Sequence, residues 1–289
     1  MSNDSGQQRA SLIADAVQCV FEAGGRAALA TVIESSAGGL VVGAKLLVRD
    51  SGEMAGSLGG PEIDAAVARR TPAFLHSRDE AKIITVDDFA AELTGFADTK
   101  LLFERVEAEP RLVIAGAGHV GASLARLAQL VGYRVTLIDD RAEFVEAKLF
   151  EAAGMQHAGG VRTGIELVAA DDWQRAMREA IGNGRSVSVA IVTRGHKQDE
   201  ECLRAAIELK PDYVGMIGSK RRTNIVLDKL REEGADENDL KKVRAPIGLD
   251  IGAVSPEEVA LSILAEIVAE RRDGSGVSLS KWRRDEKLL

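Results

Sequence analysis

The chain has 289 residues, of which 45% are hydrophobic and 28% charged, the composition of an ordinary globular protein of one to three domains. Its formal net charge of -8 argues against nucleic acid or an anionic membrane as a partner held by general electrostatics. The polar amino terminus lacks the layout of a signal peptide, and no apolar run approaches the ~20 residues that span a bilayer, so we expect no membrane insertion and a cytoplasmic protein.

The two cysteines, Cys19 and Cys202, lie far apart in segments of apolar periodicity. We expect both to be small core residues rather than reactive thiols, because free cysteine is usually buried. No disulfide framework or CxxC pair can be drawn, which fits a reducing compartment. The four histidines do not lie at metal-ligand spacing with cysteine or acid, so we predict no structural zinc.

Residues 1–107 predict a small α+β domain. Apolar residues at helical spacing predict a helix over 8–23, which Gly24 and Gly25 would end. Pro61 suits the first turn of a second helix. The remaining elements expected in this domain are strands at 26–34, 44–49, 54–57, 82–86 and 100–106 and that second helix over 61–75.

After a polar linker at 107–110, strand-like and helix-like segments alternate, which is typical of βαβ units on a parallel sheet. We therefore predict an α/β fold, with a Rossmann-like domain over 108–273 and a tail over 274–289. The strands are expected at 111–115, 134–139, 165–169, 187–193 and 212–217. The helices are expected at 119–131, 143–153, 172–182, 198–209, 220–233 and 256–271.

The clearest motif is the GxGxxG pattern formed by Gly116, Gly118 and Gly121, with His119 in its middle, between an apolar strand and an amphipathic helix. Gly116 would form the tight turn, Gly118 would let amides approach a diphosphate, and Gly121 would let helix and strand pack closely. Backbone amides near residue 118 should then face an open crevice. The alternative is that these glycines only pack a strand on a helix.

Asp139 ends the second strand of this domain and suits a carboxylate that accepts hydrogen bonds from ribose hydroxyls. An acid there favours NAD over NADP, because it repels a 2'-phosphate. Arg141 nearby weakens that preference.

Two further loops follow predicted strands at the end of the sheet where ligands collect. In the first, His196 could exchange a proton with a ligand and Asp199 could orient it, although both could equally serve as a loop residue and a helix cap. In the second, Ser219, Lys220 and Arg221 open a helix and could bind a phosphate, unless they are a solvated face.

A glycine-rich segment around Gly248 and a buried-looking Asp250 could be a binding loop or only a connection. In the amino-terminal domain, two small-residue loops would leave backbone donors open to an oxygen-rich ligand, or else form tight turns. The residues of interest in these two loops are Gly43, Lys45, Ser57, Gly59 and Gly60.

With these residues laid out, the chain resembles the xanthine dehydrogenase accessory family, XdhC/CoxI, over nearly its whole length. The resemblance is strongest in the segment from Ala245 to Gly252 and in Ser255 to Glu258. The other similar segments are Gly116–Gly121, the loop around His196 and Asp199, Met216–Arg222, Ala30–Glu34, Gly43–Val48 and Gly56–Gly60.

The resemblance implies a cytoplasmic maturation factor that binds molybdenum cofactor and hands it to an apo molybdenum hydroxylase, such as xanthine or carbon monoxide dehydrogenase. It also implies a homodimer and adds a cysteine desulfurase as a candidate partner. The residues singled out in the two domains are expected to meet across an interdomain cleft. A chaperone needs affinity and release, which agrees with the lack of an obvious nucleophile or metal triad.

One departure from the family matters. Where its members usually read Ser-Gly-Gly-Cys, this chain reads Leu58-Gly59-Gly60-Pro61, and a second cysteine-containing glycine motif is missing from residues 92–106. Sulfur ligation from this loop is therefore lost. Either other groups hold the cofactor, or the chain has become an NAD-dependent oxidoreductase or a non-catalytic nucleotide sensor.

Overall fold

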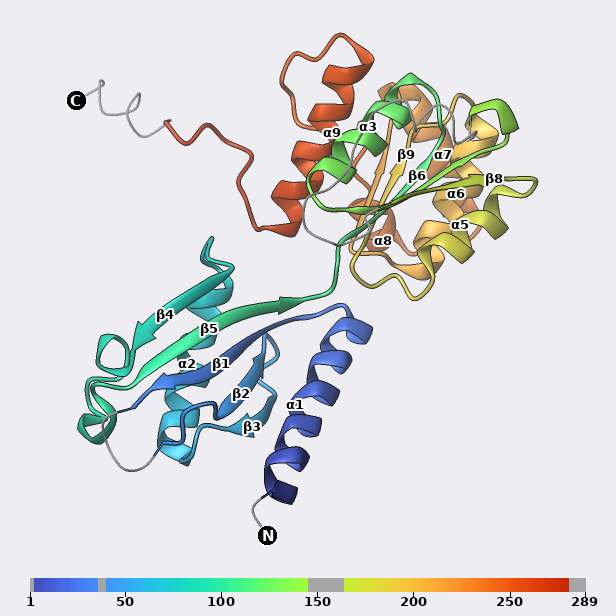
Figure 1. Cartoon of the computed structure of the whole chain (residues 1–289). Helices are drawn as coiled ribbons and strands as arrows, with labels where there is room; N and C mark the ends of the chain where they lie inside the picture. The colour runs from blue at the N-terminus through green and yellow to red at the C-terminus, as the bar shows by residue number, and fades with distance from the viewer. Residues whose placement is uncertain (1–2, 36–39, 145–163, 281–289) are drawn as a thin grey trace, which may run out of the picture. The chain divides into compact units, whose positions relative to one another are not determined.

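The computed structural model describes residues 3–35, 40–144 and 164–280. The chain forms two compact units, Met1–Ala108 and Glu109–Leu289 (Figure 1). Among the described residues, no helix combines the length and apolarity that crossing a bilayer requires.

The amino-terminal unit is built on a five-stranded antiparallel sheet in the order β3-β2-β1-β5-β4. Helices α1 and α2 contact this sheet (Figure 1). The strands are β1 (Arg26–Glu34), β2 (Lys45–Arg49), β3 (Met54–Ser57), β4 (Ala81–Thr85) and β5 (Lys100–Glu107), and the helices are α1 (Asn3–Ala23) and α2 (Pro61–Leu75), with short 3-10 turns at Val86–Asp88 and Thr94–Phe96.

Side chains of β1 alternate between two cores, as strand geometry requires. Ala28 and Ala30 belong to the core that includes Val67 of α2, whereas Ala27 belongs to the core that includes Val20 of α1. Cys19, one residue before Val20, is exposed, so the expectation of a core cysteine is wrong there. The reason is helical geometry, which turns consecutive residues about 100° apart and points Cys19 away from the sheet.

The carboxyl-terminal unit contains a five-stranded parallel sheet in the order β10-β9-β6-β7-β8, which confirms the predicted α/β class. Its strands are β6 (Arg111–Ala115), β7 (Arg134–Asp139), β8 (Ile165–Ala169), β9 (Val187–Ile191) and β10 (Tyr213–Met216). Its helices are α3 (His119–Leu130), α5 (Trp173–Ile181), α6 (His196–Leu209), α7 (Lys220–Glu232), α8 (Glu237–Lys242) and α9 (Pro256–Arg271).

Helices cover both faces of this sheet (Figure 1). Leu112 and Ile114 of β6 pack in a core with residues of α3 and α9, whereas Val113 and Ala115 pack in a core with residues of α5 and α6. Burial on both faces explains why these strands read as continuous apolar runs. The chain leaves β6 for β7 on one side and later places β9 on the other, so the switch point of the topology lies between β6 and β9.

Most of the predicted elements are confirmed within one to three residues. Helix α9 opens with a capping box formed by Ser255 and Glu258. The helix predicted over 143–153 lies mostly outside the described residues, which show a short 3-10 turn at Ala142–Phe144. The six-residue helix α8 was not predicted, because it is too short to show a helical apolar period.

Candidate functional site

The GxGxxG segment forms the turn between β6 and α3, and the physical reason for glycine differs among its three positions. Gly116 has φ +109°, and a Cβ atom there would stand 2.7 Å from the carbonyl oxygen of Val192. A Cβ atom at Gly121 would collide with the carbonyl oxygen of Gly116. Gly118 is different, because its φ of −65° is open to any residue and its Cβ would meet no atom of the described residues within 4 Å. The fold therefore requires two of the glycines, and the third faces open space.

That open space is a pocket of about 90 Å³ at the carboxyl ends of the strands, beside the switch point. Whole-ligand pockets usually measure roughly 300–1,000 Å³, so this one has space for one group of a ligand, such as a phosphate. The residues that line it are Gly116, Gly118, Asp139, Asp140, Arg141, Trp173, Val192, Thr193, Arg194 and Gln198. Sequence reasoning missed Asp140 and Trp173, although their places soon after β7 and β8 were a signal.

Asp139 is buried beside the glycine turn and is fully engaged with neighbouring donors. Its Oδ2 accepts hydrogen bonds from the amide of Ala117 at 2.7 Å and from Nη2 of Arg141 at 3.0 Å. Its Oδ1 accepts from the amide and Nε of Arg141, at 3.0 and 2.8 Å. Burial alone would raise the pKa of Asp139, but these hydrogen bonds outweigh it and lower the pKa. The carboxylate is thus an ionised anchor for Arg141.

Two other side chains of the pocket form a looser ion pair. Arg194 Nη2 lies 3.3 Å from Oδ2 of Asp140, and the arginine side chain is half exposed. Exposed pairs of this kind contribute little stability, so Arg194 can exchange its partner at small cost.

His196 and Asp199 do not form the predicted pair. His196 is exposed at the first residue of α6, whereas Asp199 is completely buried. Asp199 accepts hydrogen bonds from Thr193 Oγ1 at 2.5 Å and from Arg222 Nε at 2.6 Å. Asp199 lies one helical turn after His196, which made it look like an orienting partner, but its two carboxylate oxygens are engaged by Thr193 and Arg222.

The residues at the cationic start of α7 have different surroundings. Ser219 caps the helix by accepting a hydrogen bond from the amide of Arg222, a role that the sequence analysis did not predict. Lys220 and Arg221 are exposed and form no ion pair with any described residue. They are not among the residues that line the 90 Å³ pocket. Arg222, the next cation on this helix, pairs with Asp199. A phosphate role for Ser219, Lys220 and Arg221 stays a prediction.

Gly248 and Asp250 lie in an irregular segment packed on α9. A Cβ atom at Gly248 would stand 2.5 Å from Oγ of Ser262, and its amide donates to Glu266 at 3.0 Å. Asp250 is exposed, which corrects the expectation of a buried aspartate, and it accepts a hydrogen bond from the amide of Gly252. Gly248 is therefore explained by packing.

His119, the first residue of α3, has an exposed side chain and is not among the residues that line the pocket. Its place at a helix start beside the glycine turn made it a candidate ligand contact. That role stays a prediction.

In the amino-terminal unit, the loop donors expected to be open are largely used internally. The amide of Gly43 donates to Val32, and the amide of Gly59 donates to Ser57 Oγ at 3.1 Å. The hydroxyl of Ser57 in turn donates to Asp64 at 2.6 Å. These contacts are those of tight turns, which was the alternative.

Lys45 and Gly60, both partly buried, are the remaining candidates in this unit. The ammonium group of Lys45 donates to Thr31 Oγ1 at 2.8 Å and forms no ion pair with a described carboxylate. A Cβ atom at Gly60 would meet nothing within 4 Å. That these residues join those of the Rossmann unit stays a prediction.

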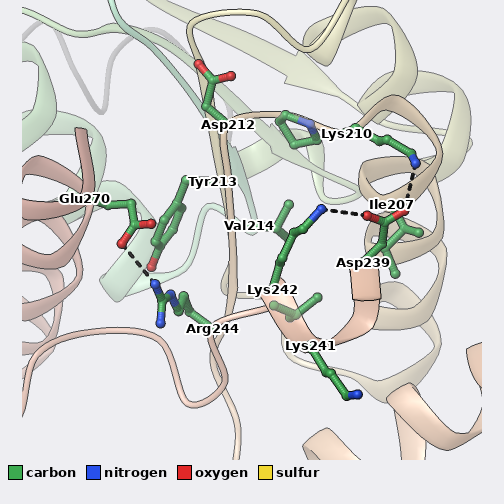
Figure 2. A pocket seen from close by; sticks show the side chains of 12 residues that line it. Ile207, Lys210, Asp212, Tyr213, Val214, Asp239, Lys241, Lys242, Arg244 and Glu270 are labelled. Atoms are coloured by element: carbon green, nitrogen blue, oxygen red, sulfur yellow. Dashed lines mark hydrogen bonds and ion pairs between the residues drawn. The ribbon is translucent and has the colours of Figure 1, made fainter. Parts of the chain in front are cut away.

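A larger hollow of about 460 Å³ lies at the opposite, amino-terminal end of β10 (Figure 2). Figure 2 shows Lys210 and Lys242 pointing toward Asp239, at 2.9 and 3.0 Å, and Arg244 pointing toward Glu270 at 3.0 Å. These pairs cancel most of the local charge. The larger hollow lacks the glycine turn and lies at the end of the sheet where ligands rarely bind. We therefore favour the smaller pocket as the functional site.

No group of three or more His, Cys, Asp or Glu residues is arranged to hold a metal ion in the described part of the chain. Cys202 is buried in the core, and burial raises the pKa of its thiol well above the usual range. A buried thiol with a raised pKa is a poor metal ligand, so Cys202 is not a candidate for one.

Comparison with known proteins gives two family-model matches in the expected order. Residues 112–267, more than half of the chain, match the XdhC Rossmann domain, and residues 20–87 match the XdhC and CoxI family. The second match covers the part of the amino-terminal unit that contains the small-residue loops.

Three curated relatives share these regions. The chain is 28% identical over 262 residues to the uncharacterized protein YqeB of Escherichia coli, covering 88% of this chain and 45% of YqeB. It is 27% identical to a probable xanthine dehydrogenase subunit of Bacillus subtilis, and the match covers 60% of this chain and 47% of that protein. It is 37% identical over 84 residues to the molybdenum cofactor insertion chaperone PaoD of Escherichia coli, and this match covers 28% of this chain and 26% of PaoD. The chain thus spans less than half the length of each relative.

A solved structure described as a xanthine dehydrogenase from Bacillus halodurans aligns with 93% of this chain and 98% of its own. The sequence identity is 18% and the TM-score 0.48, so this likeness carries no argument about function.

Proposed function

The chain belongs to the XdhC and CoxI family, and from this membership we propose that it is an accessory factor that binds molybdenum cofactor and delivers it to a molybdenum hydroxylase. The names of two relatives, a molybdenum cofactor insertion chaperone and a probable xanthine dehydrogenase subunit, support this role. The partner in the proposal is an apo hydroxylase such as xanthine or carbon monoxide dehydrogenase.

One structural observation carries the proposal: Gly118 faces open space in a pocket that two arginines line. The first turn of α3 leaves backbone N–H groups without intrahelical acceptors, and the helix dipole favours negative charge there. Molybdenum cofactor is a pterin that carries a phosphate, so it has a group suited to this pocket. The residues that would hold the phosphate are Gly118, the amides that follow it, and Arg141.

The pocket supports binding rather than turnover. Asp139 and Asp199 are both committed to arginines, and His196 is exposed and forms no ion pair with a carboxylate of the described residues. A chaperone must hold its cargo and release it, and this task needs no general base. When bound, the cofactor would supply its molybdenum centre to the recipient enzyme, while this chain would bind the phosphate end.

The loss of the family cysteine near Pro61 bears on how the molybdenum end is held. In the described residues, the amino-terminal unit offers Lys45 and the loop around Gly60, and these are candidates for polar rather than sulfur contacts. A cysteine desulfurase as second partner, a homodimer and a cytoplasmic location belong to the same proposal and rest on the family resemblance.

The decisive experiment is to purify the protein from cells grown with ample molybdate and to measure bound molybdenum and fluorescent oxidised pterin. We expect both to accompany the wild-type protein in a fixed ratio. A Gly118→Leu variant should fold but carry neither. Wild-type protein that contains no pterin, and does not take up cofactor released from a molybdenum enzyme, would refute the proposal.

A non-catalytic nucleotide sensor is the second candidate, because the glycine turn and the topological switch point suit a nucleotide phosphate as well. Binding of NAD or NADP without turnover, in a protein that carries no pterin, would favour it. An NAD-dependent oxidoreductase is less supported, since Asp199, the carboxylate expected to orient His196, is bonded to Thr193 and Arg222.

A further inference from the structure

We propose that Arg141 is the residue that determines ligand specificity in the glycine-turn pocket, and that it selects a ligand carrying a phosphomonoester over one presenting an unphosphorylated ribose diol. This inference rests on the proposed function for the site but extends it, because it names the chemical group that the site recognises. It reverses the preference for NAD that Asp139 alone suggested.

The first step is that Asp139 has no capacity left for a ribose. A carboxylate offers about four lone-pair positions. Here Oδ1 accepts two hydrogen bonds from Arg141, and Oδ2 accepts one from Ala117 and one from Arg141, all between 2.7 and 3.0 Å. A ribose hydroxyl would have to displace one of these donors from a residue that is only 2% exposed.

The second step is that Arg141 keeps hydrogen-bonding capacity that Asp139 does not use. A guanidinium has five N–H groups, and the contacts with Asp139 occupy Nε and one N–H of Nη2. The described residues accept no hydrogen bond from the remaining three. Asp139 therefore orients the guanidinium through one fork and leaves N–H groups of the other fork for a second oxyanion, an arrangement that phosphate fits in a bidentate manner.

The third step is that the guanidinium is held in place before any ligand arrives. Its Cζ lies 3.7 Å from the centre of the Phe144 ring, so the flat faces of the two groups are close. Stacking restrains the plane of the guanidinium while its edges stay open. Arg141 is one-quarter exposed and lines the pocket together with Gly118.

The fourth step concerns space and charge. The pocket of about 90 Å³ is too small for a whole dinucleotide, but it suits one phosphate. A phosphomonoester carries about −1.5 to −2 charges near pH 7, so it gains more from a cation and a helix start than a neutral diol does. Arg194, whose pair with Asp140 is half exposed, can add a second cation.

Two ligands share this chemistry: a pterin with a side-chain phosphate, and the 2'-phosphate of NADP. We suggest isothermal titration of the full chain with NADP and NAD, and with an oxidised phosphopterin before and after phosphatase treatment. The test variants are Arg141→Gln and Arg141→Lys, the second of which keeps the charge that Asp139 needs. Arg231→Gln is the matched control, since Arg231 is exposed on α7 and pairs with Glu237 and Asp228.

In at least one ligand pair, the wild type should bind the phosphorylated form at least about tenfold more tightly, the size of one charge-assisted hydrogen bond. Both Arg141 variants should lose most of that preference, and Arg231→Gln should keep it. Equal affinity for both members of each pair, a preference that survives in Arg141→Gln, or no binding of any probe would overturn the inference.

These outcomes separate the inference from the proposed function. A protein that purifies with molybdenum and pterin, but binds phosphopterin and dephosphorylated pterin equally well, keeps the proposed function and loses the inference. A protein that binds only NADP, through Arg141, keeps the inference and loses the proposed function.

Discussion

The carboxylate of Asp199 accepts hydrogen bonds from the guanidinium of Arg222, which lies 23 residues further along the chain on the next helix. The pair joins the loop after β9 to the start of α7, because Arg222 also donates to the carbonyl of Thr193 at 3.2 Å. Asp199 is completely buried, whereas the arginine side chain is 21% exposed. Removing Arg222 would therefore leave a buried charge, whereas removing Asp199 would leave a charge that water can reach.

We predict that Arg222→Gln destabilises the protein by about 3–5 kcal/mol, because it leaves a buried carboxylate without its cation. Asp199→Asn should cost less, since water can reach Arg222 and the amide can still bond to Thr193. Urea unfolding of the two variants and the double variant measures the costs and their coupling. Equal costs for the two single variants would contradict the assigned asymmetry.

The same pair predicts a pH dependence. Burial raises the pKa of Asp199 despite the opposing hydrogen bonds from Thr193 and Arg222, and removing Arg222 should raise it further. A raised folded pKa contributes stability that is present below the ordinary pKa of about 3.9 and is lost as the pH rises through the folded value. The deficit of Arg222→Gln relative to wild type should therefore shrink as the pH falls from 7 toward 4. A deficit that grows on acidification would contradict this.

For Asp139 we predict a pH dependence of stability opposite to that of Asp199. Burial pushes its pKa up, but the hydrogen bonds from Arg141 and Ala117 lower it below the ordinary value. Its stabilising contribution is present above about pH 3.9 and is lost as the pH falls through the folded pKa. Asp139→Asn should cost about 1.5–3 kcal/mol near neutral pH, with a difference from wild type that narrows below about pH 4. Unfolding free energies measured across this range test the prediction.

The glycine turn allows folding and binding to be separated. Gly121→Ala should destabilise the protein by about 1–3 kcal/mol, because its Cβ collides with the backbone of Gly116. Gly118→Leu should cost less than about 1 kcal/mol, since its φ is ordinary and its Cβ meets open space, yet it should abolish ligand binding. Thermal unfolding and pterin content are the readouts. Normal pterin content in Gly118→Leu would place the ligand elsewhere.

Arg105 predicts a purely structural effect in the amino-terminal unit. Its guanidinium is 2% exposed and donates to the carbonyls of Leu75 and Ser77, at 2.9 and 3.0 Å, near the end of α2. Arg105→Ala should cost about 3 kcal/mol or more, because these carbonyls lose a charged donor. Arg69→Ala is the control and should change stability by less than about 0.5 kcal/mol, since its pair with Glu92 is exposed. Hydrogen exchange of the backbone amides of β1 measures the stability of the amino-terminal unit and tests this prediction.

His196 provides the test between chaperone and enzyme. Since it is exposed and Asp199 is committed to Arg222 and Thr193, we expect His196→Ala to retain wild-type pterin content and cofactor transfer to an apo hydroxylase within about twofold. A steady-state reaction that this substitution abolishes, with ligand binding intact, would favour the oxidoreductase alternative.

Local sequence patterns predicted the parallel sheet and its glycine turn well, because strand and helix periodicity depends on residues a few positions apart. They predicted less well which side chains point inward. Cys19 and Asp250 were expected inside and are exposed, since one step along a helix or an irregular loop changes the side chain's direction. The short helix α8 was missed because six residues hold too few apolar positions to show a period.

Short-range periodicity and turn chemistry were enough to predict the order of strands and helices, the two-part organisation and the position of the glycine turn. Which charges are satisfied within the protein depends on contacts that form only when the chain folds. The pairing of Asp199 with Arg222 depends on parallel strands bringing distant loops to one edge of the sheet. The saturation of Asp139 by Arg141 and Ala117 likewise depends on distances that no sequence spacing specifies.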